Sequence, residues 1–469
     1  MEQDKNDDIM KKTFCPLPWN SINLRNNGDL RLCCNANSYT ANRGIIRKED
    51  GTPYNAGKDD WNEARNAELL KDVRKTMLKG EWHPECERCR QEETNDIRSR
   101  REYEREDWAE YFGKHIDAKK AFEITDEDGT IDVDKQKINF VDIRYGNFCN
   151  LKCRMCGPTD SHKWYEDHVK VHNRTHFKDT HEVIELTKNA KGKYSTDQYD
   201  WFQDSNMYWH NFEKYAVDAH KLYIVGGEPL IIQEHFESLE RIVASGKAPG
   251  MRLEYNTNLT NVPPRLLEIW EEFKEIRLGV SIDGYGDVFN YQRFPGNFDQ
   301  VYKNMQAIDD NKNIALKGWF AVTVTPLNVF HFPEFMKWKL ITSGLTRFNS
   351  ITADRPVVSH HMCHSPKYYN IKVLPPELKV AVREHYQTYI DWAQNSDEIN
   401  DHVRKHFIKL AVGTVKFMES EDYHDKTAWD DKTWLDELVI NTTKLDEIRG
   451  QNILDVVPQY GDLFNAYNK

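Results

Sequence analysis

Short apolar runs alternate with segments of helical periodicity through the middle of the chain. The runs predict strands at 138–144, 221–225, 252–256, 276–282, 316–325 and 347–352. Helices are expected between them, for example at 235–245, where Leu239 and Ile242 share an apolar face, and at 298–309. Strands that alternate with helices form parallel sheets, so the pattern predicts an α/β fold of the β/α barrel type.

The segments around this middle region have other patterns. Residues 90–120 mix basic and acidic charges, which indicates a solvated linker helix rather than an RNA-binding surface. The polar insertion at 170–203 predicts a surface elaboration or a substrate lid, and the chain from about 374 onward predicts helices. We therefore expect a cysteine-rich N-terminal module, a charged linker, the barrel and a mainly helical C-terminal region, at 1–95, 96–134, 135–355 and 356–469.

Composition narrows the class of protein. The 469 residues are enough for two or three domains, and the net charge of -12 argues against general nucleic-acid binding. Mean hydropathy is -0.79, and no apolar stretch approaches the length that spans a bilayer. The start of the chain lacks the apolar segment of a signal peptide. We therefore expect a cytoplasmic protein whose nine cysteines are thiols or metal ligands rather than disulfides.

Three cysteines lie close together just after the first predicted barrel strand. Cys149, Cys153 and Cys156 have the spacing CxxxCxxC. Three thiolates on one loop can hold three corners of an iron–sulfur cube and leave the fourth iron without a protein ligand. A structural zinc site normally has four protein ligands, so a group of three cysteines favours a reactive cluster over a structural metal site. Zinc binding is the alternative interpretation of the spacing.

Small polar residues follow the next strands of the predicted barrel. The strand at 221–225 leads into Gly226, Gly227, Glu228 and Pro229, a turn in which the backbone can approach a ligand closely. The following two strands end in Asn256 and Asn258, and in Ser281 and Asp283. The carboxyl ends of parallel barrel strands meet at one face, where ligands bind. The sequence thus predicts one site made by the cysteine loop and these strand ends.

Together these motifs resemble the radical S-adenosylmethionine (radical SAM) superfamily. The resemblance implies a partial (β/α)6 TIM-like barrel and a 4Fe-4S cluster that is held by Cys149, Cys153 and Cys156 and binds S-adenosylmethionine (SAM). It also implies cofactor-binding roles for residues in the matching motifs. These are Gly226, Gly227, Glu228 and Pro229 at the methionyl amino group, Asn256, Asn258, Ser281 and Asp283 near the ribose or carboxylate, and Met155 near adenine. Arg293 would neutralise the SAM carboxylate, with a surface ion pair as the alternative.

A second group of cysteines lies near the N-terminus. Four of Cys15, Cys33, Cys34, Cys86 and Cys89 could close a tetrahedral site, which zinc or an iron–sulfur cluster would fit. The segment resembles the SPASM and twitch modules, which implies an auxiliary 4Fe-4S cluster held by Cys15, Cys86, Cys89 and either Cys33 or Cys34, with Cys33 slightly favoured. Most relatives carry this module after the barrel, so the distance between the two sites does not follow from the resemblance.

The resemblance implies a reaction but not a substrate. The reduced enzyme would cleave SAM to a 5′-deoxyadenosyl radical that abstracts hydrogen from a substrate, and the auxiliary cluster would assist oxidation. A peptide or protein side chain is the leading substrate class, and a reductase or a flavodoxin-type protein would supply electrons. No catalytic acid or base stands out. The alternatives are an iron–sulfur electron carrier and a zinc-stabilised interaction protein.

A last cysteine, Cys363, lies among histidines in the sequence His360-His361-Met-Cys363-His364. We expect these residues to lie in a loop, where adjacent histidines more often bind no metal. The alternative is that Cys363 or its neighbouring histidines face the substrate.

Overall fold

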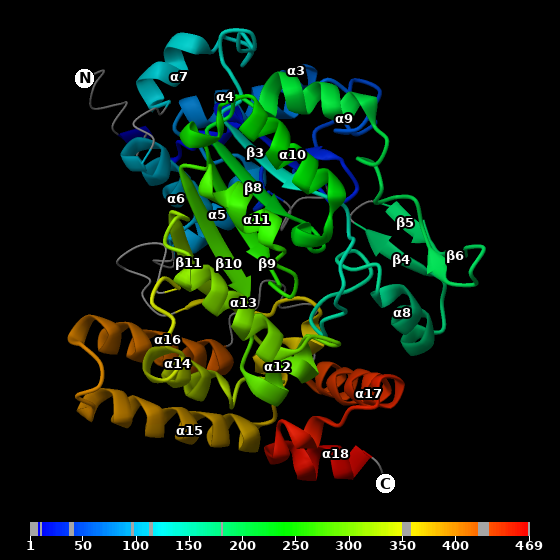
Figure 1. The fold of residues 1–469 in the computed structure, drawn as a ribbon, viewed down its shortest axis with the longest axis vertical. Helices are drawn as coiled ribbons and strands as arrows, with labels where there is room; N and C mark the ends of the chain where they lie inside the picture. The colour runs from blue at the N-terminus through cyan, green and yellow to red at the C-terminus, as the bar shows by residue number, and fades with distance from the viewer. Residues whose placement is uncertain are drawn as a thin grey trace.

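The molecule is built around one eight-stranded sheet (Figure 1). The computed structural model describes residues 8–9, 12–36, 42–94, 98–111, 116–179, 182–348, 358–420 and 431–467. The strand order is β12-β11-β10-β9-β8-β3-β1-β2. The six strands of the predicted barrel region run parallel: β3 (Phe140–Arg144), β8 (Lys221–Val225), β9 (Arg252–Thr257), β10 (Glu275–Ser281), β11 (Leu316–Val324) and β12 (Ser359–Met362). The α/β fold with a mostly parallel sheet is confirmed.

Helices connect the parallel strands as the periodicity predicts. They are α8 (Trp164–His172), α9 (Asn206–Asn211), η3 (Phe212–Ala216), α10 (Gln233–Ala244), α11 (Pro264–Glu271), α12 (Gly286–Gln292), α13 (Phe298–Asp310) and α14 (Phe332–Ile341). Leu239 and Ile242 of α10 are fully buried, as their shared face indicates. Asn297 begins α13, because its side chain accepts a hydrogen bond from the backbone N–H of Gln300.

The last parallel strand differs from the prediction. Of the strand expected at 347–352, positions 349–352 lie outside the described residues, and β12 begins later, at Ser359. The histidine pair therefore lies in a strand, and the loop interpretation is wrong. Consecutive strand residues point to opposite faces, so His360 is half-buried against the Phe332 ring while His361 is exposed.

Two strands from the cysteine-rich N-terminal region extend the same sheet. β1 (Ser21–Leu24) pairs parallel with β3, with Asn23 opposite Asp142, and β2 (Leu30–Arg31) pairs antiparallel with β1. The remaining N-terminal elements are α2 (Leu17–Asn20), α3 (Trp61–Ala64), α4 (Glu68–Leu78), η1 (Pro84–Cys86) and α5 (Glu87–Thr94). The predicted module thus shares backbone hydrogen bonds with the barrel.

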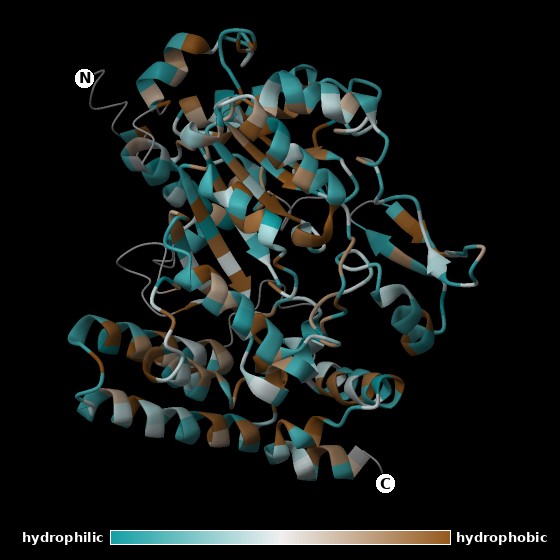
Figure 2. Ribbon diagram, in the orientation of Figure 1, coloured by the Kyte–Doolittle hydropathy of each residue, from teal (hydrophilic) through white to brown (hydrophobic). Residues whose placement is uncertain are grey.

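The two faces of the sheet have opposite character. One row of paired residues across five neighbouring strands is apolar and buried: Ile22, Val141, Leu222, Leu253 and Ile276. The next row along the same strands is polar: Asn23, Asp142, Tyr223, Glu254 and Arg277. Figure 2 shows hydrophobic colour concentrated on the central strands and both colours mixed on the helices. The apolar face packs into the core, and we call the polar face the inner face of the sheet.

The charged segment that follows the N-terminal cysteines is buried in part. It forms α6 (Arg100–Glu106), continues into η2 (Asp107–Tyr111) and is followed by α7 (Ala118–Ile124). Glu104 is fully buried and Asp107 is 8% exposed, and both pair with Lys221 at the start of β8. The prediction of a solvated helix is therefore wrong, because its acidic residues neutralise buried bases of the sheet.

The polar insertion after α8 forms two small hairpins that project from the sheet (Figure 1). They consist of β4 (His176–Asp179) with β5 (Glu182–Glu185), and β6 (Thr187–Lys188) with β7 (Tyr194–Ser195). Their buried side chains, which include Phe177 and Ile184, form a separate small core with Tyr165 of α8. The insertion is thus a folded elaboration.

The C-terminal region is helical, as predicted, and lies across the end of the sheet toward which β10 points (Figure 1). It comprises α15 (Pro376–Asn395), α16 (Asp401–Glu419), α17 (Asp431–Arg449) and α18 (Gly461–Tyr467), with short turns η6 (Lys367–Tyr369), η7 (Ile371–Val373), η9 (Ile453–Asp455) and η10 (Pro458–Tyr460). Among the described helices, none is both long and apolar enough to cross a bilayer.

Candidate active site

The loop after β3 brings three free thiols together. Cys149 and Cys153 are buried and Cys156 is half-buried, and all three pack around Leu151 and Met155. N–H groups point at the sulfurs: the Asn258 amide lies 3.8 Å from Cys149 Sγ, and the Arg293 guanidinium lies 3.8 Å from Cys153 Sγ. Donors of this kind stabilise thiolates and tune an iron–sulfur cluster.

The glycine turn after β8 packs directly on this cysteine loop. The Gly227 N–H donates to Gly146 O at 3.2 Å, and the Glu228 N–H donates to Phe148 O at 2.7 Å. A Cβ on Gly227 would lie 2.1 Å from Phe148 O, and Gly226 has a φ of +120°. Only glycine fits both positions, so the pair lets the turn approach the backbone that carries Cys149.

The Glu228 side chain fastens the turn to the next strand. Its carboxylate accepts hydrogen bonds from Thr257 Oγ1 and the Asn258 N–H, both at 2.6 Å, and from the Leu230 N–H at 3.0 Å. Burial raises the pKa of Glu228 to about 7, although these donors oppose the shift. The side chain thus holds the ends of β8 and β9 together, and Pro229 starts the short turn η4 (Pro229–Ile231) that follows.

The remaining residues predicted to bind the cofactor take different positions. Asn258 donates to Asn150 Oδ1 at 2.9 Å in the cysteine loop, so it belongs to the site. Asn256 donates to the Tyr223 hydroxyl at 2.7 Å and lies on the inner face of the sheet. Ser281 is half-buried at the end of β10, and Met155 is half-buried beside the cysteines.

Arg293 forms a buried ion pair. Its Nε lies 2.8 Å from Asp283 Oδ2, and Arg293 and Asp283 are 7% and 0% exposed. Asp283 Oδ1 also accepts a hydrogen bond from the Thr323 N–H at 2.7 Å. The surface ion-pair alternative is wrong, because the pair is enclosed and Asp283 aims the Arg293 guanidinium at Cys153.

The C-terminal helix α17 clamps the cysteine loop, which the sequence does not indicate. Arg154, between Cys153 and Cys156, pairs with Asp446 of α17 and stacks 3.7 Å from the centroid of the Tyr291 ring. Arg449 of α17 pairs with Asp167 of α8 at 2.9 Å. The partners are 292 residues apart in the first pair, so no local pattern could have revealed them.

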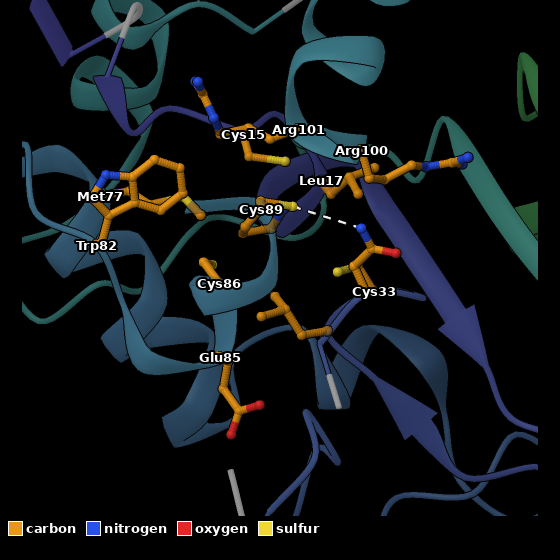
Figure 3. Close-up of a pocket in the computed structure, with 13 residues that line it drawn as sticks. Cys15, Leu17, Cys33, Met77, Trp82, Glu85, Cys86, Cys89, Arg100 and Arg101 are labelled. Atoms are coloured by element: carbon orange, nitrogen blue, oxygen red, sulfur yellow. Dashed lines mark hydrogen bonds between the residues drawn. The ribbon is translucent and has the colours of Figure 1, made fainter. Parts of the chain in front are cut away.

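The N-terminal cysteines line a cavity of their own. Cys15, Cys33, Cys86 and Cys89 all contribute to its wall, together with Trp82, Arg100 and Arg101, whereas Cys34 is not among the lining residues (Figure 3). The Asn35 amide donates to Cys89 Sγ at 3.8 Å. Burial raises the pKa of Cys15 to about 12 and also raises that of Cys33. Four enclosed thiols with nearby cationic and amide donors fit an iron–sulfur cluster.

Neither cysteine group is arranged around a single ion. Among the described residues, no three His, Cys, Asp or Glu side chains gather closely enough to hold one metal ion. The thiolates of an iron–sulfur cube each bind a different iron, so they stand farther apart than the ligands of one zinc ion.

Comparison with known proteins finds a family model that matches the middle of the chain. Residues 143–338 match the family model described as the Radical SAM superfamily. This stretch of the chain is therefore similar to the radical SAM domain. The matched region begins within β3 and includes the cysteine loop, the glycine turn and the ends of β9 and β10. No curated protein sequence matches the chain.

Solved structures that are similar to the chain include anSMEcpe and SuiB, each in several states. One is native anSMEcpe with bound AdoMet and Cp18Cys peptide, at 15% identity over 55% of this chain and 60% of that chain, with a TM-score of 0.32. Another is Streptococcus suis SuiB bound to S-adenosylmethionine, at 15% identity over 74% of this chain and 68% of that chain, with a TM-score of 0.33. SuiB bound to precursor peptide SuiA matches at 12% identity over 76% of this chain and 71% of that chain, with a TM-score of 0.31. The chain spans about 60% of the length of anSMEcpe.

Proposed function

We propose that the chain is a radical SAM enzyme whose cysteine loop holds a 4Fe-4S cluster with SAM. The packing of the Gly226-Gly227 turn onto the loop of Cys149, Cys153 and Cys156 carries the proposal, because it joins the two motifs at the carboxyl ends of the strands. When bound, these groups supply reductive cleavage of SAM to a 5′-deoxyadenosyl radical, which abstracts hydrogen from the substrate.

The residues of this chain bind and orient. Cys149, Cys153 and Cys156 are the three cluster ligands, and the turn offers backbone groups to the methionyl end of SAM. Arg293 places a fixed positive charge beside Cys153, and Asp283 holds it there. Helix α17 covers the loop through Arg154, which excludes water from one side of the cluster.

The cavity near the N-terminus would hold the auxiliary cluster. Cys15, Cys33, Cys86 and Cys89 supply a full set of four thiolates, which leaves no iron open to substrate. This arrangement suits electron transfer from a substrate radical and therefore a net oxidation. A peptide or protein side chain remains the proposed substrate class, on the strength of the resemblance to SPASM and twitch proteins.

Anaerobic purification tests the proposal. We expect two clusters per chain and formation of 5′-deoxyadenosine from SAM after reduction with dithionite. Cys153→Ala should abolish this cleavage, whereas Cys363→Ala, a matched change at a buried cysteine of another loop, should not. Stoichiometric zinc without iron would instead identify a zinc-stabilised interaction protein, and iron without SAM cleavage would identify an electron carrier.

The auxiliary site is tested separately. Cys86→Ala should remove iron from the N-terminal cavity and leave SAM cleavage by the loop cluster in place. Loss of both clusters in a folded variant would contradict two independent sites.

A further inference from the structure

A polar row crosses the inner face of the sheet between the two cysteine groups. Arg31 pairs with Asn23 on the neighbouring strand, Asn23 with Asp142, and Asp142 with Tyr223, so their side chains share one face. Arg144 lies two residues after Asp142 on that same face. We call Arg31, Asp142, Arg144 and Tyr223 the inner polar cluster.

The part of this face nearer the amino ends of the strands is filled by protein. Arg277 donates to the Tyr103 hydroxyl at 2.8 Å, and lies 3.3 Å from Asp107. Lys221 and Arg252 also pair with Asp107. The α6–η2 segment therefore covers this end of the inner face and satisfies its charges.

Three members of the inner polar cluster, Arg31, Asp142 and Arg144, have buried atoms without hydrogen-bond partners among the described residues, whereas the Tyr223 hydroxyl accepts from Asn256. Asp142 is fully buried, yet within the described part of the chain neither carboxylate oxygen accepts a hydrogen bond. Its nearest cation is Arg144 Nε at 3.4 Å, without hydrogen-bond geometry. Arg31 is 6% exposed, and its Nε likewise has no acceptor among the described residues. Buried polar groups without partners are rare, and they point to a ligand that completes them.

The inner polar cluster adjoins both cysteine groups. Arg144 ends the strand that leads to Cys149, and a Cβ on Gly226 would lie 3.4 Å from the Arg144 carbonyl carbon. Cys34 is an electrostatic neighbour of Arg31 and Arg144. Cys33, the residue before Cys34, lines the auxiliary cavity. A substrate bound to the inner polar cluster would lie beside the Gly226-Gly227 turn and near the N-terminal cysteines.

The charge of the cluster selects the ligand. Arg31 and Arg144 contribute two positive charges, and Asp142 contributes one negative charge. The nearby Arg100 adds no net charge because its guanidinium forms an ion pair with Glu104 at 2.6 Å. A single negative charge balances the set, and a phosphate dianion would be repelled by Asp142. The planar guanidinium matches a carboxylate through paired hydrogen bonds.

We propose that Arg31 and Arg144 bind a carboxylate of the substrate, with Asp142 accepting a hydrogen bond from an adjacent substrate N–H. This inference rests on the proposed function and gives its substrate a chemical class: a peptide with a free carboxylate beside the reacting carbon. The Arg144 side chain is 22% exposed, so a ligand can reach it.

Equilibrium binding to the reconstituted holoenzyme, without reductant, tests the inference. The probes are N-acetylglutamate amide, its glutamine counterpart, and N-acetylglycine, which distinguish a side-chain carboxylate from a C-terminal one. We expect one carboxylate probe to bind about tenfold or more tightly than the neutral glutamine probe. Equal binding of the charged and neutral probes, or no binding of any, overturns the inference.

Variants locate the site. Arg144→Gln and Arg31→Gln should each weaken the carboxylate probe about tenfold or more, and Arg31→Lys, which keeps the charge but loses paired donors, should weaken it less. Arg241→Gln, at an exposed pair with Glu213, is the matched control. Iron content and thermal unfolding verify that each variant is folded. Unchanged binding in both arginine variants overturns the assignment.

The wild-type enzyme separates the two proposals. Formation of 5′-deoxyadenosine without a carboxylate preference refutes only the inference, whereas carboxylate binding without SAM cleavage refutes only the proposed function.

Discussion

Substitution of Lys221 measures how much the buried ion pairs at the amino ends of the strands stabilise the fold. Lys221 is fully buried, and its ammonium lies 3.0 Å from Glu104, 3.3 Å from Asp107 and 3.6 Å from Glu254. Lys221→Met keeps the length of the side chain but removes the charge, so three buried carboxylates lose a shared partner.

The expected loss of stability is large. Removing one partner of a buried ion pair costs about 3–5 kcal/mol, because the other charge stays buried without compensation. Arg252 and Arg277 still pair with Asp107, so we expect about 3 kcal/mol, at the lower end of that range. Lys247 makes a 2.7 Å pair with Asp218, but the side chains are 54% and 42% exposed, and Lys247→Met should cost at most about 1 kcal/mol.

The difference should depend on pH. Burial raises the pKa of Asp107 and Glu254, but Lys221 leads the cations that outweigh burial and hold both pKa values below their ordinary range. Carboxyls with lowered pKa stabilise the fold above about pH 4, and this contribution is lost as pH falls. Without Lys221 the pKa values are less depressed, so the stability gap between wild type and variant should narrow in acid.

Urea unfolding followed by circular dichroism measures both effects, with midpoints compared at neutral and acidic pH. The reasoning fails if Lys221→Met and Lys247→Met shift the midpoint equally, or if the gap for Lys221→Met does not change with pH.

Three further experiments test the Glu228 carboxyl and the two cysteine sites. Burial raises the pKa of Glu228 to about 7, so its ionisation opposes folding as pH rises from about 4.5 to about 7. Glu228→Gln should therefore gain stability relative to wild type across this interval, as measured by thermal unfolding. A stability difference that stays constant across the interval would contradict the raised pKa. Asp446→Asn should weaken the hold on Arg154 and lower the iron retained by the loop during gel filtration, whereas the exposed Asp462→Asn should not. Cys33→Ser should lose the iron of the N-terminal cavity and Cys34→Ser should keep it; the reverse result would exchange their roles.

The strands could be predicted because each is a short run rich in apolar residues between segments of helical periodicity. The starts of β8, β9 and β11 coincide with the predicted positions. Charged residues at strand starts, such as Lys221 and Arg252, belong to the buried core only because Asp107 lies against them, more than a hundred positions earlier in the chain. Because of that distance, the local charge pattern around Glu104 indicates a solvated helix although the structure buries it.

The site was predictable where its chemistry is local. The cysteine spacing and the glycine pair are short sequence motifs, and each has a physical explanation: metal ligation for the cysteines and close backbone approach for the glycines. The structure brings the two motifs into contact. The clamp of Asp446 on Arg154 joins residues that share no pattern, and the pair of Asp283 and Arg293 depends on how the end of β10 packs against the end of α12. Contacts of this kind follow from tertiary packing, which periodicity does not describe.

The position of β1 at the flank of β3 has a consequence for dissecting the protein. A recombinant fragment that begins at the barrel would leave one side of β3 with bare N–H and C=O groups that β1 now pairs. Such an edge recruits strands from other molecules and promotes aggregation. The parallel sheet of this chain should therefore not be produced without the N-terminal strand that covers its edge.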